Sequence, residues 1–232
     1  MAASLPSELF RRRTVASLHF FLVLTLLGIL AYWGASHARE WRSTQSPDRI
    51  PRYMRTIVQE WLILGIVLLG VWRSGSSIFT VLGERWRSVR QIFTDIGIGV
   101  AFLIVSVLFV SIIGPIVGMK HDNREIQFLL PQGGREILCW FAVAISAGIC
   151  EEAVYRGYLQ QQFTAFTRSA ALGIFLSAFI FSLEHLYQGF ARAFVILLGS
   201  TLSGVLAYWR RTVRPGMVAH VLQDLLPLLI HR

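Results

Sequence analysis

The chain has 232 residues, of which 54% are hydrophobic and 15% charged, whereas roughly 25% of the residues of a typical soluble protein are charged. Its mean hydropathy of +0.57 excludes a disordered chain, a coiled coil and a solenoid of polar-faced repeats, and it argues against a water-soluble domain. The net charge is +9, but the arginines stand in short clusters between apolar runs, as in membrane-span flanks that meet anionic headgroups. We therefore expect a lipid bilayer, and no nucleic acid, as the partner of this basic chain.

The N-terminal half contains three apolar runs that predict membrane spans, at 15–33, 56–72 and 96–119. The first run follows a basic cluster at 11–13 and is longer than the apolar core of a usual signal peptide, so we expect a retained anchor. Between the second and third runs, residues 74–91 combine arginines with apolar side chains. This mixture predicts an interfacial amphipathic segment.

The C-terminal half contains four further apolar runs, at 137–150, 169–186, 193–209 and 215–230. Inside lipid every backbone polar group must be paired within the protein, so uniformly apolar runs of this length predict helices. The predicted fold is an all-α, polytopic membrane bundle of about seven transmembrane helices. Such a protein is integral and multi-pass, and it lies in the plasma membrane if its source is bacterial.

Ionisable side chains interrupt the apolar runs of the C-terminal half, although a charge at the bilayer centre costs about 2.5–3.5 kcal/mol. In the first 133 residues only Glu60 and Asp95 are comparable, and both fall near predicted helix starts. Polar groups that are retained inside a membrane indicate a functional site. The residues concerned are Glu151, Glu152, Arg156, Glu184, His185, His220 and Asp224.

Three of these residues, Glu151, Glu152 and Arg156, belong to one predicted helix. Glu152 and Arg156 are four residues apart, share a face and can form an ion pair. Glu151 lies about 100° around the helix from Glu152, so that pair does not neutralise it and it can face a cavity. A purely structural ion pair explains Glu152 and Arg156 equally well. It explains Glu151 less well, because a second carboxylate adds a desolvation cost without adding packing.

The two histidines lie on different predicted helices. Phe181 is four residues before His185 and can wall one side of its imidazole. Asp224 is four residues after His220 and can accept a hydrogen bond from the ring and fix its tautomer, or reach the same substrate atom. A lone histidine on an apolar helix usually serves packing, but two histidines together with free acids favour a site.

Two chemistries fit Glu151, His185 and His220. As metal ligands, with Asp224 as a further candidate, they resemble the two-histidine, one-glutamate set of catalytic zinc sites, in which water occupies the open position. Without metal, Glu151 would be a general base for water, His185 would assist it, and His220 with Asp224 would stabilise an oxyanion. Both chemistries hydrolyse an acyl bond such as a peptide bond. A divalent metal, Zn²⁺ above all, and a metal-free glutamate mechanism therefore both stay open.

Three segments resemble, in order, the motifs of the CAAX-protease and bacteriocin-processing (CPBP, or Abi) family. Residues 151–156, Glu-Glu-Ala-Val-Tyr-Arg, resemble EExxxR, and residues 181–185, Phe-Ser-Leu-Glu-His, resemble FxxxH. Residues 220–224, His-Val-Leu-Gln-Asp, resemble HxxxN or HxxxD. The resemblance implies an intramembrane endopeptidase similar to the type II CAAX prenyl proteases, with an active site inside a helical bundle.

The resemblance also implies roles and a division of the chain. Glu151 would activate water with His185 and His220 as partners, Asp224 would take the final motif position, and Glu152 and Arg156 would complete the first motif. Residues 134–232 would form the catalytic core, and residues 1–133 would supply three N-terminal spans and the interfacial segment.

The expected substrate is a hydrophobic or lipidated peptide or a segment of a membrane protein. Two other functions compete with this hypothesis. A catalytically silent member of the family would act as a membrane scaffold or regulator, and the same polar residues would then serve packing. An ion-coupled transporter would also carry intramembrane acids and histidines, but the chain shows no internal duplication and confines its polarity to one half.

Overall fold

The computed structural model describes residues 17–43, 49–83, 85–119 and 127–230. Within these ranges the chain forms helices and turns and no strand, which confirms the all-α membrane bundle. The helices are α2 (Ser17–Ser43), α3 (Ile50–Arg73), α4 (Phe79–Leu82), α5 (Val89–Ile116), α6 (Gly134–Glu151), η1 (Glu152–Leu159), α7 (Gln160–Thr167), α8 (Ala170–Glu184), η2 (Leu186–Gln188), α9 (Phe190–Arg210), α10 (Arg214–Leu225) and α11 (Pro227–Ile230).

Five helical stretches of the described chain are long and apolar enough to cross a membrane: 18–38, 50–73, 89–116, 134–167 and 190–210. The predicted number of seven spans is not confirmed. The run at 169–186 forms a helix of 15 residues, and the run at 215–230 forms one of 12 residues followed by a short helix. Both are shorter than the about 20 residues that a straight span needs.

The fourth span differs most from its prediction, because it does not end where the acidic residues begin. The helix continues from α6 through η1 into α7, over residues 134–167. All eight residues of η1 are buried in the protein, including its charged ones. The polar residues that interrupt the apolar pattern therefore face protein and not lipid, and they do not end the helix.

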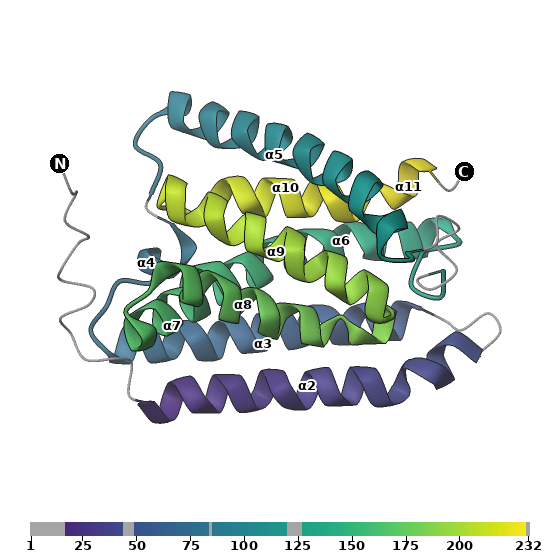
Figure 1. The fold of residues 1–232 in the computed structure, drawn as a ribbon, viewed down its shortest axis with the longest axis horizontal. Coiled ribbons are helices and arrows are strands. Elements are labelled where there is room, and N and C mark those ends of the chain that lie inside the picture. Colours follow the sequence, from purple (N-terminus) through teal and green to yellow (C-terminus); the bar gives the residue numbers. More distant parts are fainter. Residues whose placement is uncertain (1–16, 44–48, 84, 120–126, 231–232) are drawn as a thin grey trace.

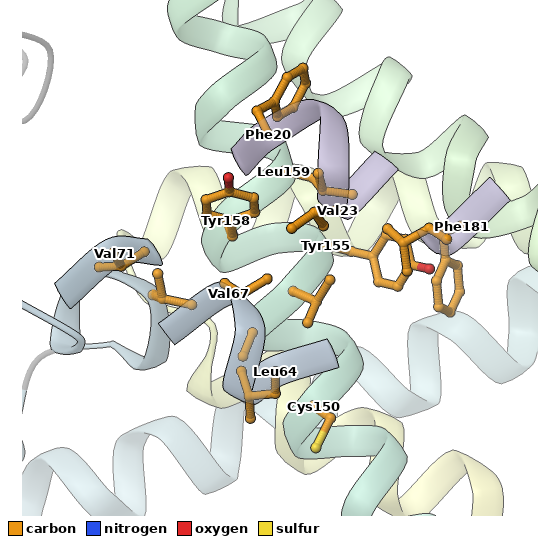
Figure 2. Packing of buried hydrophobic residues seen from close by; sticks show 14 residues of the cluster. Phe20, Val23, Leu64, Val67, Val71, Cys150, Tyr155, Tyr158, Leu159 and Phe181 are labelled. Atoms are coloured by element: carbon orange, nitrogen blue, oxygen red, sulfur yellow. The ribbon is translucent and has the colours of Figure 1, made fainter. Parts of the chain in front are cut away.

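The helices run side by side along the long axis of the molecule (Figure 1). Helix α2 lies along one edge and α5 along the opposite edge, with the C-terminal helices between them. A hydrophobic core joins α2, α3, η1 and α8 (Figure 2), and Val23, Val67 and Leu159 are fully buried in it. The N-terminal helices thus pack directly on the segment that carries the first motif.

His19 ties three of these elements together from within α2. One ring nitrogen lies 2.9 Å from the hydroxyl of Tyr158 on η1, and the other lies 3.0 Å from the carbonyl of Ile66 on α3. A side chain at Gly70 would overlap the His19 ring, so glycine at this position allows the close approach. The one ionisable residue of the first predicted span is therefore a packing residue with both nitrogens engaged.

The amphipathic segment expected over 74–91 is not a continuous helix. Gly75 and Gly83 have positive φ angles of 75° and 89°, a conformation that glycine adopts without strain and that interrupts a helix. Only the four residues of α4 are helical between them, and Val81 of this helix is buried in the core. At Gly157, a side chain would overlap the backbone of Val81, so α4 rests directly on η1.

Candidate functional site

The first motif lies where an α-helix changes into a π-helix. Glu151 is the last residue of α6 and Glu152 the first of η1. A π-helix is wider than an α-helix, is rare, and often occurs at functional sites. Here it holds Glu152 and Arg156 inside the protein, where their side chains are 1% and 4% exposed.

Glu152 forms the centre of a buried ionic network. Its Oε1 lies 3.0 Å from Nη1 of Arg156, which confirms the predicted ion pair, and the same oxygen lies 3.2 Å from Nδ1 of His220. Arg156 also donates to Ser200 at 3.0 Å and stands 4.7 Å from the centre of the Phe181 ring. The network therefore joins η1 to α8, α9 and α10.

Helix α10 reaches this network because it carries glycine at the point of contact. A Cβ at position 216 would lie 2.7 Å from Oε2 of Glu152. Any residue larger than glycine would therefore have to displace this carboxylate. The first-turn position of Pro215 in this helix is as predicted. His220 follows one turn after Gly216 and faces the same carboxylate.

The ring of His220 lies between three carboxylates. Nδ1 faces Glu152, while Nε2 lies 3.5 Å from Oε2 of Glu151 and 3.8 Å from Oδ2 of Asp224. Because an ionised carboxylate only accepts hydrogen bonds, Nδ1 must carry a proton toward Glu152. Asp224, which was expected to orient this ring, lies within ion-pair distance of it but beyond hydrogen-bond distance. Glu152 makes the shorter contact, from a helix far away in the sequence.

His185 stands apart from this cluster. It directly follows the last residue of α8, and its Nδ1 lies 2.9 Å from the carbonyl of Phe181. The Phe181 ring contacts its imidazole at 4.5 Å between centroids, as predicted, and contacts the ring of His220 at 6.2 Å. Among the described residues, His185 makes no hydrogen bond or ion pair with Glu151. The two histidines are brought to one phenyl ring, but not to one atom of Glu151.

Glu151 opens onto a cavity of about 180 Å³. The wall is built by α2, α3, the α6–η1 junction and the end of α8. The side chain of Glu151 is 21% exposed, in contrast to the 1% of its neighbour Glu152. The structure thus agrees with the expectation that one acid is paired and the other faces open space.

Two further acids line the same cavity, Glu60 from α3 and Glu184 from α8. The apolar pattern predicts that the second span begins at residue 56, which puts Glu60 near a helix start. The helix begins at Ile50, so Glu60 lies inside it and faces the cavity. Arg52 and Arg55 lower the hydropathy of the first turns of this helix, so the apolar pattern predicts a start that is too late.

The cavity also contains basic and aromatic groups that the motifs do not include. Arg52 and Arg55 of α3, Trp33 and Trp41 of α2 and Tyr187 of η2 all line it. The apolar pattern predicts only that Arg52 and Arg55 flank the span at 56–72, and it carries no signal that they line a cavity.

The expected metal ligands do not form a ligand group in this arrangement. In the part of the chain that the structure describes, no three His, Cys, Asp or Glu side chains are grouped to hold a metal ion. Glu151 and Asp224 approach Nε2 of His220, but His185 directs one nitrogen to a backbone carbonyl. A zinc site made of Glu151, His185 and His220 would require these side chains to move together.

Comparison with known proteins finds one family that resembles the C-terminal part of the chain. Comparison with curated proteins and with solved structures gives no match. Residues 133–226 match the family model "Type II CAAX prenyl endopeptidase Rce1-like", a family of proteases. The matched range contains all three motifs, and together with the five membrane-competent helices it identifies an integral membrane protein. Residues 133–226 of this chain are thus similar to the Rce1-like family of type II CAAX prenyl endopeptidases.

Proposed function

We propose that this protein is a multi-pass intramembrane endopeptidase that hydrolyses a peptide bond in a hydrophobic or lipidated peptide or membrane-protein segment, with Glu151 as the base that activates water. The observation that carries the proposal is the contrast between the two adjacent acids. Glu152 is closed inside an ion pair, whereas Glu151 opens onto the cavity and faces the imidazole of His220. A partly exposed carboxylate beside a cavity can accept a proton from water that enters it.

In this mechanism Glu151 takes a proton from water as the water oxygen attacks the carbonyl carbon of the substrate. The resulting tetrahedral intermediate collapses when the carbon–nitrogen bond breaks, and Glu151 returns the proton to the leaving amine. His220, whose Nε2 faces Glu151 and Asp224, is the nearest candidate to donate toward the developing oxyanion. We assign His185 to the same site through Phe181, which contacts both rings.

Glu152 and Arg156 act as positioning residues in this proposal. Glu152 accepts from Nδ1 of His220 and so sets which nitrogen faces Glu151. Arg156 keeps Glu152 ionised and in place through its ion pair, and Ser200 and Phe181 hold Arg156 in turn.

The variant Glu151→Gln tests the proposal directly, because glutamine keeps the volume and removes both the base and the charge. We expect purified enzyme in nanodiscs to lose cleavage of a hydrophobic reporter peptide while accumulating normally in the membrane. Glu136→Gln is the matched control, since this acid lies on the same helix but outside the cavity. Wild-type cleavage by the Glu151 variant would reject the base. A scaffold would cleave nothing and would keep its cellular function in that variant.

Metal dependence is a separate question with its own measurement. The proposed mechanism uses the side chains alone, so we expect activity to survive exhaustive chelation. Loss of activity on chelation, with recovery on adding Zn²⁺, would show instead that the enzyme depends on a metal ion, for which Glu151, His185 and His220, with Asp224, would be the candidate ligands. The two outcomes leave the assignment of Glu151 to the site unchanged.

A further inference from the structure

The cavity beside Glu151 has an acidic side that the proposed mechanism does not use. Glu60 lines it from α3 and Glu184 from the end of α8. Among the described residues, neither acid forms an ion pair, and Oε2 of Glu60 and Oε1 of Glu184 are buried without a hydrogen-bond partner. The charges that act on Glu60 are those of Glu151, Asp224 and Glu184, which are all negative. Buried carboxylates are normally paired with a cation, so this side of the cavity is suited to a positively charged ligand.

A buried hydroxyl group adds a third oxygen to this acidic side. Tyr155 extends from η1 toward Phe181 of α8, with 4.8 Å between the two ring centroids (Figure 2). Tyr155 is 2% exposed and lines the same cavity. Its hydroxyl interacts with the carboxylate of Glu184, but this oxygen has no well-formed hydrogen bond in the described part of the chain. A phenylalanine would pack on Phe181 equally well and leave no buried polar atom unpaired, so the hydroxyl indicates a polar ligand.

Oxygen-bearing side chains that line one cavity from α3, η1 and α8 are suited to a primary ammonium group. Such a group carries three N–H donors and no acceptor, and a carboxylate or hydroxyl oxygen can accept from each donor. The described acids are not grouped closely enough to hold a metal ion, whereas an ammonium group on a flexible stem can reach acceptors that stand apart. Leu27, Leu30 and Ile63 also line the cavity, and they offer apolar surface to the methylene stem of a lysine side chain.

We infer that Glu60, Glu184 and Tyr155 form a subsite that binds the ammonium group of a substrate lysine close to the cleaved bond. The inference rests on the proposed function and specifies its substrate class, a hydrophobic segment with a lysine beside the bond that is hydrolysed. The lysine lies close to that bond because the subsite shares its cavity with Glu151. None of the three residues is a fixed position of the motifs, since Tyr155 and Glu184 occupy x positions and Glu60 lies outside all three.

The test uses one hydrophobic reporter peptide with an acetylated N-terminus, in which a lysine is moved through the positions on both sides of the cleaved bond. At each position acetyl-lysine is the neutral comparison, because it keeps the stem and removes the charge. For the wild-type enzyme in nanodiscs of neutral lipid, we expect a position at which kcat/KM for lysine exceeds that for acetyl-lysine by about ten- to a hundredfold, as for a hydrogen-bonded charge. The difference should lie mainly in KM. Equal rates at every position would overturn the subsite, and this result needs no variant.

The double variant Glu60→Gln/Glu184→Gln should lose the preference for lysine over acetyl-lysine, because glutamine keeps the volume and removes both charges. This variant should also accept glutamate at the lysine position better than the wild-type enzyme does. Glu136→Gln is the matched control, since this acid lies outside the cavity, and it should keep the full preference for lysine. If the double variant keeps the preference as well, the two acids do not bind the lysine side chain.

Two further arms separate this inference from its alternatives. A peptide also carries an ammonium group at its N-terminus, so the assay is repeated with a free N-terminus and no lysine. If only the free N-terminus raises kcat/KM, the subsite binds the chain end and the assignment to lysine fails. Binding of the lysine and acetyl-lysine peptides to Glu151→Gln measures recognition without turnover. Tighter binding of the lysine peptide supports the subsite even if Glu151 is not the base, whereas equal cleavage rates reject the subsite and leave the base in place.

Discussion

Replacing Glu152 by glutamine would remove one charge from a buried cluster and leave its partners behind. The Glu152 side chain is 1% exposed and contacts Arg156 at 3.0 Å and His220 at 3.2 Å. Removing one partner of a buried ion pair costs about 3–5 kcal/mol, because the other charge remains buried and uncompensated. Arg156 keeps Ser200 and the Phe181 ring, so we expect the lower end, about 3 kcal/mol, or roughly a hundredfold in the ratio of folded to unfolded protein.

The assay is the free energy of unfolding of the purified protein in mixed micelles, titrated with a denaturing detergent. Glu151→Gln is the control, since its partly exposed carboxylate should change that free energy by less than about 1 kcal/mol. The double variant Glu152→Gln/Arg156→Met should recover most of the loss, because it removes the stranded cation as well. Stability of the single variant equal to that of Glu151→Gln would refute the view that Glu152 anchors this network.

Three further predictions concern other parts of the bundle. Gly157→Ala should lower the free energy of unfolding by about 1–3 kcal/mol because its Cβ would meet backbone, whereas Gly65→Ala, which faces open space, should not; equal midpoints in detergent titrations would contradict this. Asp95→Asn should destabilise by about 2–3 kcal/mol, since the 4% exposed carboxylate pairs with two arginines; an unshifted unfolding midpoint would rule that out. Cys139 should react with a maleimide in the native protein and buried Cys150 should not, and mass spectrometry would expose the opposite order.

Contacts between residues close in the chain were predictable from the sequence. The pairing of Glu152 with Arg156 and the stacking of Phe181 on His185 both follow from a four-residue spacing on a helix. The absence of Glu151 from the ion pair of Glu152 with Arg156 also follows, because adjacent residues on a helix point in different directions.

Contacts between distant helices were not predictable in the same way. Glu152 and Asp224 are both acids that could orient His220, and spacing alone favours Asp224, which is on the same helix. The choice depends on the approach of α10 at Gly216, and helix periodicity carries no information about that approach. The π-helical geometry of η1 likewise depends on what its buried polar side chains contact.

The ends of the spans were hidden for a related reason. Hydropathy locates the apolar centre of a membrane helix. It does not locate the ends of the helix where charged residues line a protein cavity, because those residues lower the local hydropathy. Arg52 and Arg55 therefore looked like a flanking loop, and α3 in fact begins before them at Ile50. Because the predicted start of the helix is too late, Glu60 is predicted near a helix start. It lies well within α3 and lines the cavity.

The most direct measurement of the central claim follows one turnover of a hydrophobic peptide in water carrying a heavy oxygen isotope, with mass spectrometry of product and enzyme. If Glu151 activates water, the new carboxyl group of the product contains one heavy oxygen after the first turnover, and the Glu151 carboxylate contains none. Heavy oxygen in Glu151 with an unlabelled product would show that Glu151 attacks the substrate itself, and labelled product from Glu151→Gln at the wild-type rate would show that another group activates the water.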